Sequence, residues 1–137
     1  MRFMILVRAN PISESGSMPD PGLMAAMATY HEELASAGVL LDASGLQPSA
    51  RGWRVRYRGG KPDVVDGPFA ETKEMIAGYT MIQVPSREAA VEWTRRFPSP
   101  FGSATDCEIE VRQVYELDDF DAGEAVERFR ALPTSQA

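Results

Sequence analysis

The sequence contains a single histidine, His31, and this side chain is the one ready general base near neutral pH. A carboxylate that accepts a hydrogen bond from one ring nitrogen would fix its tautomer and raise its basicity. Asp66, at the end of a short apolar segment, is the natural candidate for that carboxylate. A simpler interpretation stays open, because a lone histidine on an apolar helical face is most often a packed core or edge residue.

Asp66 opens the polar stretch that runs from residue 66 to residue 74. Gly67 and Pro68 predict a turn, since glycine accepts positive φ and proline fixes its own φ. Phe69 is an apolar ring within this polar turn, which predicts that it anchors the turn to the core. The stretch is either a well-anchored polar loop or a loop that presents Asp66 to a pocket.

Three further charged residues are candidates for binding a substrate. Arg56 is central among three arginines that alternate along residues 53–58, and a guanidinium suits bidentate binding of a carboxylate. Lys73 and Glu74 leave the polar turn and either contribute to the pocket or pair with each other. A solvated face with ion pairs at an edge explains the arginines equally well.

Composition and charge exclude several classes of function. The 137 residues carry a net charge of −6, which argues against a nucleic-acid surface and against an anionic membrane. One histidine and one cysteine, Cys107, cannot form a zinc site of the usual spacing, and no glycine-rich phosphate loop follows a strand. We therefore expect no metal, no cofactor and no nucleic acid. The single cysteine and the absence of a long apolar run predict a cytoplasmic protein.

The first half of the chain predicts one helix between extended segments. Phe3 to Val7 is a continuous apolar run typical of a strand buried on both faces, and residues 9–22 form a long loop. Asp20 as N-cap and Pro21 as first residue start a helix that ends near Ala37, before Gly38. Further predictions are a short extended segment at 39–41, a loop at 42–49, and a hairpin with strands at 53–58 and 63–65.

The second half predicts a strand, a helix, a strand and a tail. The strand covers residues 76–84, the helix begins at Ser86 and runs through Phe97, and the last strand covers residues 107–117. The tail, residues 118–137, holds a short helix capped by Asp121, and its last residues, 133–137, are predicted to be disordered. The chain thus divides into a domain at 1–117 and this C-terminal tail.

This order of elements predicts an α+β fold of the ferredoxin-like split βαβ plan. The helices should cover one face of the sheet, with the apolar side of residues 53–58 toward them. The strands at 3–7 and 76–84 carry apolar residues on both faces, so the other face also needs cover. Face-to-face association of two sheets in a homodimer would supply it.

The run Asp66-Gly67-Pro68-Phe69-Ala70-Glu71-Thr72-Lys73-Glu74, followed by Gly78-Tyr79, resembles the signature of the DGPF-domain proteins of the YCII-related family. This resemblance spans about residues 1–117 and implies a dimeric α+β barrel. It also implies a His–Asp pair in the cleft, with His31 matching the family histidine and Asp66 the first signature residue. Family members are mostly uncharacterised, and DGPF-type proteins are often associated with extracytoplasmic-function sigma factors.

The leading hypothesis is a cofactor-independent acid/base enzyme of the lyase or isomerase type. His31 would transfer the proton, Asp66 would orient it, and Arg56 or Lys73 would hold a small anionic metabolite. One alternative is a non-catalytic ligand-binding or regulatory dimer that associates with a sigma factor. Another is a scaffold dimer in which the signature loop is purely structural.

Overall fold

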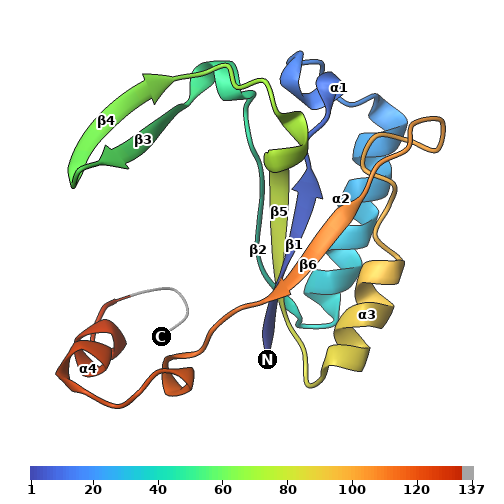
Figure 1. The fold of residues 1–137 in the computed structure, drawn as a ribbon. Helices are drawn as coiled ribbons and strands as arrows, with labels where there is room; N and C mark the ends of the chain where they lie inside the picture. Colours follow the sequence, from blue (N-terminus) through green and yellow to red (C-terminus); the bar gives the residue numbers. More distant parts are fainter. Residues whose placement is uncertain (134–137) are drawn as a thin grey trace.

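A computed structural model describes residues 1–133 of the chain. Its body is a four-stranded antiparallel sheet with two helices, α2 and α3, on one face (Figure 1). The strand order is β2-β5-β1-β6, which is the ferredoxin-like arrangement and confirms the predicted α+β class. The bounds are β1 Arg2–Arg8, α2 Pro21–Ser36, β2 Leu40–Gly45, β5 Ile76–Gln83, α3 Arg87–Arg95 and β6 Ile109–Gln113.

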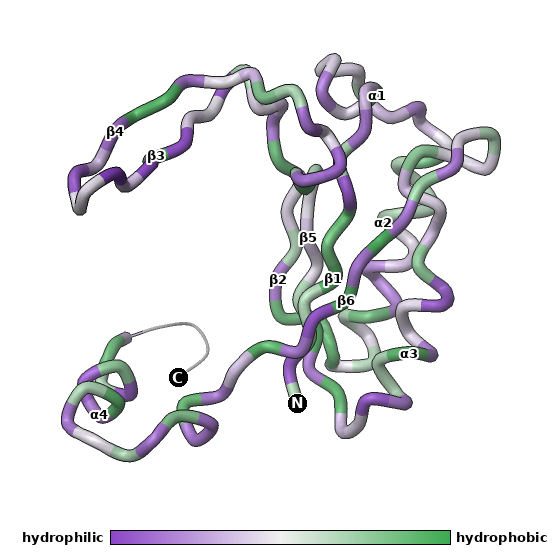
Figure 2. Tube along the Cα trace, in the orientation of Figure 1, coloured by the Kyte–Doolittle hydropathy of each residue, from purple (hydrophilic) through white to green (hydrophobic). Residues whose placement is uncertain are grey.

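The core lies between the sheet and these two helices. Phe3 and Ile5 point into it from β1, Ile82 from β5 and Leu34 from α2, and all four are almost fully buried. Hydropathy along the chain follows the same pattern, with β1 hydrophobic over most of its length (Figure 2). Burial of such side chains stabilises a fold by about 1.5–3 kcal/mol each, which fixes α2 against the sheet.

The opposite face of the sheet is also apolar at its centre. Met4 and Leu6 alternate with the buried residues of β1, so they point away from α2 and α3. They lie opposite Met81 and Tyr79 of β5 in the antiparallel register. This face therefore has the apolar centre that the sequence predicted.

The hairpin forms a separate two-stranded sheet that projects from the body (Figure 1). Its strands are β3 Trp53–Arg58 and β4 Lys61–Asp66. The hairpin was predicted, but the expectation that its apolar side packs under a helix is wrong. Trp53 is 65% exposed and Tyr57 is 73% exposed. Period-two alternation shows that a strand has two unlike faces, but it does not show which sheet the strand joins.

The turn after β4 is locked against the segment η1, Ser49–Arg51. A Cβ atom at Gly67 would lie 1.9 Å from the carbonyl oxygen of Ser49, so only glycine fits there. The amide of Phe69 donates to Ser49 Oγ at 3.0 Å. The ring of Phe69 packs under the guanidinium of Arg54 at 3.9 Å, so it anchors the turn to the hairpin and not, as expected, to the core.

Several element boundaries differ from those predicted. The strand β2 continues from the predicted extended segment at 39–41 into residues assigned to a loop, because ladder pairing with β5 overrides the weak β propensity of Asp42 and Gly45. A short helix, α1 Pro11–Glu14, lies within the predicted loop at 9–22 and is capped by Asn10. The last strand is shorter than predicted. The caps of α2 at Asp20 and of α3 at Ser86 are confirmed.

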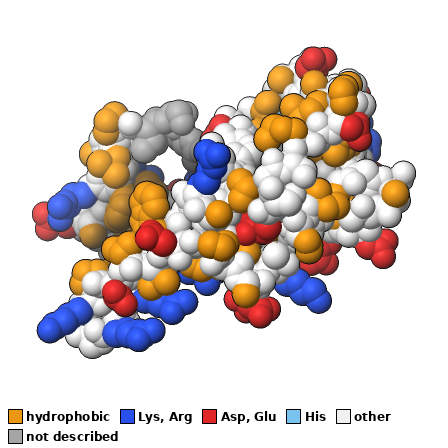
Figure 3. Space-filling model, turned by 90° about the horizontal axis from the view of Figure 1, so that it is seen from above, with side chains coloured by type: hydrophobic (Ala, Val, Ile, Leu, Met, Phe, Trp, Pro, Cys, Tyr) orange, Lys and Arg blue, Asp and Glu red, His pale blue; other side chains and the backbone are white. Residues whose placement is uncertain are grey.

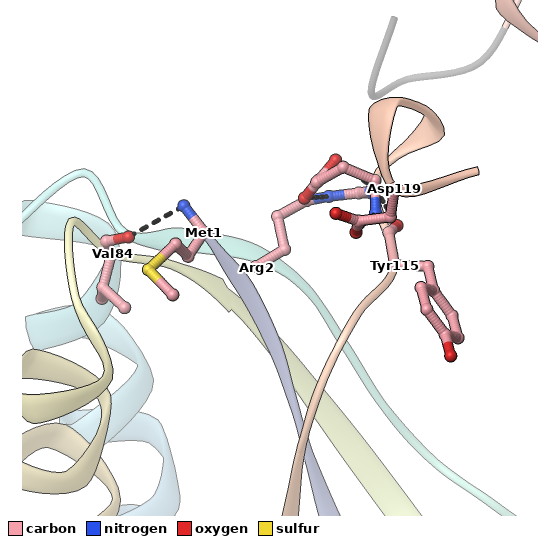
Figure 4. Close-up of polar contacts among 6 residues, drawn as sticks. Met1, Arg2, Val84, Tyr115 and Asp119 are labelled. Atoms are coloured by element: carbon pink, nitrogen blue, oxygen red, sulfur yellow. Dashed lines mark hydrogen bonds and ion pairs between the residues drawn. The ribbon is translucent and has the colours of Figure 1, made fainter. Parts of the chain in front are cut away.

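The tail leaves the body at an ion pair with the start of β1 (Figure 4). Arg2 donates from Nε and Nη2 to the two carboxylate oxygens of Glu116 at 2.9 and 3.0 Å. The amide of Glu116 in turn donates to Asp119 Oδ2 at 2.8 Å. Beyond η3, Leu117–Asp119, lies the helix α4, Glu124–Arg130, whose N-cap is Gly123 and not Asp121 as predicted. Of the residues predicted to be disordered, 133–137, those at 134–137 lie outside the described residues.

Substitution of Gly67 by alanine should destabilise the fold, because the added methyl group would collide with the backbone of Ser49. We expect the free energy of unfolding to fall by about 2 kcal/mol or more, measured by urea denaturation.

Gly52→Ala is the matched control, since its Cβ would lie 3.7 Å from the same carbonyl oxygen, an ordinary contact. Equal stabilities for the two variants would contradict the close approach at Gly67.

Ionisation of Tyr30 should make the free energy of unfolding depend on pH in the alkaline range. Burial raises the pKa of its phenol to about 12 from an ordinary value of 10.0, while its hydroxyl donates to the carbonyl of Trp93 at 2.7 Å. Because the folded state holds this proton more tightly, the contribution to stability is complete below pH 10 and is lost as the pH rises toward 12.

The variant Tyr30→Phe should therefore show a shallower loss of stability than the parent over that range. Denaturant unfolding at a series of alkaline pH values measures both slopes. Parallel slopes would show that Tyr30 is not the group responsible.

Candidate functional site

A pocket of about 850 Å³ lies where α2 faces one end of the sheet. Its wall combines side chains of α2 with the adjoining ends of β2 and β5 and with three connecting segments, residues 16–20, 46–48 and 97–101. The volume is in the range of sites that hold a drug-sized molecule. His31 and Thr80 lie on this wall, so the one histidine of the chain lines the pocket.

His31 is held by hydrogen bonds at both ring nitrogens. Nδ1 lies 2.7 Å from the carbonyl oxygen of Met27, one helical turn earlier, and Nε2 lies 2.9 Å from Oγ1 of Thr80. A carbonyl only accepts, so Nδ1 carries the hydrogen and donates it to Met27. In the neutral ring Nε2 is then the basic nitrogen, and it accepts from the Thr80 hydroxyl. The geometry thus selects one tautomer.

Thr80 links this ring to the sheet. It lies on β5 opposite Ile5 of β1 and is only 3% exposed, the one buried polar side chain among the described residues. A buried hydroxyl requires a partner, and His31 supplies it. A hydroxyl both donates and accepts, so the pair stays bonded whether Nε2 is free or protonated. His31 and Thr80 together can therefore hold or release one proton at the pocket wall.

Aromatic rings surround the imidazole. Tyr30 meets His31 edge to face, with ring centroids 5.6 Å apart, and Phe97 lies 6.2 Å away. Phe97 also lines the pocket. These contacts restrict rotation of the imidazole, which preserves its orientation toward Thr80.

Asp66 does not reach His31 within one chain. It is the last residue of β4, opposite Trp53, and it is not among the residues that line the pocket. The partners of His31 among the described residues are a main-chain carbonyl and a hydroxyl, not a carboxylate. The predicted His31–Asp66 pair is thus not formed in the single chain and stays a prediction for another state.

The predicted binding residues also lie outside the pocket wall. Arg56 lies on the hairpin, exposed and opposite Asp63. Lys73 and Glu74 belong to η2, Thr72–Glu74, where the carbonyl of Lys73 accepts from the guanidinium of Arg8. In the described part of the chain, no ion pair joins Lys73 to Glu74. Any contact of these residues with a ligand stays a prediction.

Sequence reasoning missed Thr80 and the wall segment at residues 46–48. Thr80 had a signal, since a polar residue between Gly78 and Ile82 on a buried face requires a bonded partner. No local pattern indicated the wall segment at residues 46–48, whose position depends on contacts made by the next residue, Ser49. There Ser49 donates from its amide to Glu14 Oε1 at 3.0 Å, and its hydroxyl donates to the other carboxylate oxygen. The turn at residues 66–69 packs on Ser49 and thereby supports residues 46–48 of the wall.

Metal-ligand clusters and membrane-spanning helices are both absent from the part of the chain that the structure describes. No group of three or more His, Cys, Asp and Glu side chains is placed to hold a metal ion. None of the helices there combines the length and apolar character that crossing a bilayer requires.

Comparison with known proteins gives a family and an uncharacterised relative. An uncharacterized protein of Rhizobium meliloti is 28% identical over 97 residues, which cover 71% of this chain and 78% of that protein. The family model of the YCII-related domain matches residues 1–118, which include all of the domain predicted at 1–117. The chain therefore belongs to the family of proteins with a YCII-related domain.

Proposed function

We propose that the pocket binds a small molecule and that His31 transfers a proton to or from it without a cofactor. One observation carries the proposal: the single histidine lies on the pocket wall with its basic nitrogen fixed at Nε2 by the bond from Nδ1 to Met27. A base within hydrogen-bond reach of a bound ligand typically contributes about 10²–10⁴-fold to a proton-transfer rate. The reaction class is that of a lyase or isomerase.

The chain's own residues define how the proton would move. Nε2 of His31 takes the proton, either through the Thr80 hydroxyl, which donates to it, or directly after that hydroxyl rotates away. The imidazolium then donates from both nitrogens, to Met27 and to Thr80. The Met27 carbonyl stabilises this cation through its dipole, as a carboxylate would do more strongly. The aromatic edges of Tyr30 and Phe97 keep the ring in place throughout.

Deuterium exchange tests the proposal without knowledge of the substrate. In heavy water, the parent protein should catalyse exchange of the acidic C–H protons of at least one compound in a panel of small carbonyl compounds, followed by NMR. His31→Gln should slow this exchange about a hundredfold or more. Glutamine is chosen because its amide can still bond Thr80.

The control is Thr29→Gln, an exposed position on the same helix that does not line the pocket. Absence of exchange with the parent protein, or equal exchange with His31→Gln, would refute proton transfer by His31.

A second candidate is a binding protein in which His31 only orients the ligand. The observation in its favour is that both ring nitrogens already have partners and that neither partner is a carboxylate. A protein that only binds the ligand would show ligand binding without catalysed deuterium exchange. The association with a sigma factor, implied by resemblance, stays a prediction of this second candidate.

We also propose that two copies associate through the sheet face opposite α2 and α3. Met4 and Leu6 form the apolar centre of that face, and α2 and α3 cover the other side. In the view from above, hydrophobic side chains are also mixed with charged ones over the projecting part of the molecule (Figure 3). Met4 and Leu6 are partly buried in the single chain, and an apolar sheet face that no helix covers is typical of an interaction site.

Light scattering of the purified chain should give the mass of a dimer, and Leu6→Glu should give that of a monomer. Val91→Glu, on the exposed side of α3, is the matched control and should stay dimeric. A dimeric Leu6→Glu variant would exclude this face as the interface.

The charged residues predicted to bind a ligand lie outside the pocket of the single chain. Within one chain, Arg56 and Asp66 lie on the projecting hairpin, and Lys73 and Glu74 lie just beyond it in sequence. None of these four lines the chain's own pocket. Any contact of these four residues with a ligand stays a prediction.

A further inference from the structure

We propose that the pocket takes an uncharged, mainly apolar ligand whose single hydrogen-bonding group meets His31 and Thr80. This inference deepens the proposed function and rests on its pocket. It specifies the class of molecule, which the hypothesis drawn from the sequence took to be anionic. Three observations carry it: the side chains of the wall, the charges of the wall, and the position of its polar pair.

The wall is built mainly from hydrophobic side chains, and its uncharged polar members besides His31, Thr80 and Tyr79 are Ser13, Ser17, Ser44 and Gln47. Leu23, Met24 and Met27 contribute from α2, and Phe97 and Phe101 from the segment after α3. Methionine has an unbranched, polarisable side chain that adapts to irregular apolar surfaces. Such a wall recovers the hydrophobic free energy of a hydrocarbon or ring system and does little for a hydrated ion.

The charges of the wall oppose an anion. Among the described residues that line the pocket there is no lysine or arginine, and the one carboxylate is Asp20. A bound carboxylate would lose hydration without gaining a lysine or arginine partner. The net charge of −6 adds a negative potential to this penalty.

The wall does not offer a strong site for a cation either. The carboxylate of Asp20 caps α2, where Oδ1 accepts from the amide of Leu23 at 2.8 Å. Its charge is therefore already stabilised by the positive end of the helix. A neutral ligand is the one class that this wall does not penalise.

The polar pair gives the ligand its orientation. Thr80 is 3% exposed, so its hydroxyl and Nε2 of His31 meet a ligand at the sheet side of the pocket and not at the rim. A hydroxyl or carbonyl group placed there can enter their hydrogen bond, since Thr80 both donates and accepts. The apolar body of the ligand then extends toward Met24, which is 55% exposed at the opening.

Three probes of equal chain length test the class: octanol, octanoate and octylammonium. The full-length chain carries isotope-labelled methionine methyl groups and is titrated with each probe at neutral pH, followed by NMR. Met18, Met24 and Met27 line the pocket, and Met4 on the other sheet face is the internal control. We expect octanol to shift the three pocket signals saturably and to bind about tenfold or more tightly than either ion.

Two results would overturn the proposal. One is octanoate or octylammonium binding as tightly as octanol. The other is octanol leaving the signals of Met18, Met24 and Met27 unchanged, or shifting them no more than that of Met4.

A charge added at the opening of the pocket tests whether electrostatics sets the preference among the three probes. Met24→Lys should strengthen octanoate binding about fivefold relative to Met24→Gln, which changes polarity without charge. Equal octanoate affinities for the two variants would show that charge does not set the selectivity, which contradicts the argument.

A failure of this proposal can be distinguished from a failure of the proposed function. Tight, saturable binding of octanoate at the three pocket methionines would refute the neutral class while leaving the pocket as the ligand site. Loss of deuterium exchange in His31→Gln concerns proton transfer and stands regardless of which probe binds.

Discussion

The contact between Gly67 and Ser49 is the constraint on which the rest of the structure depends. The two backbones approach so closely that no side chain fits between them, and the same serine is bonded to Glu14 and to the amide of Phe69. One residue thereby joins the base of the hairpin, the signature turn and the first short helix. The pocket wall at residues 46–48 continues directly into this junction. The turn at residues 66–69 therefore fixes, through Ser49, the position of residues 46–48 in the pocket wall.

The bond between His31 and Thr80 adds a second constraint at the opposite wall. It crosses from α2 to β5, two elements already fixed by the packing of Leu34 and Ile82. Because close-packed elements shift little, the imidazole is held by its surroundings before any ligand arrives. Preorganisation of this kind is what a proton-transfer site requires, since a misplaced base loses most of its effect. Close packing of the core therefore stabilises the fold and also holds His31 in the orientation that the proposed proton transfer needs.

The sequence predicted the architecture well and the site only in part. Helix caps at Asp20 and Ser86 and the apolar alternation of β1 are local signals, so the helices and the sheet could be read from them. His31 was found because it is unique in the chain. Its partners were not, because the choice between Asp66 and Thr80 depends on tertiary placement. The alternation of residues 53–58 could not show that their hairpin leaves the body.

The outer strands of the main sheet have a consequence for aggregation. Both are short, β2 with six residues and β6 with five, and both carry charge, Asp42 on one and Glu110 with Arg112 on the other. Unpaired strand edges invite further strands to add on, and short, charged edges discourage this. Growth of the sheet sideways into a fibre is therefore disfavoured at both ends. The chain can keep an apolar sheet surface without becoming a template for amyloid.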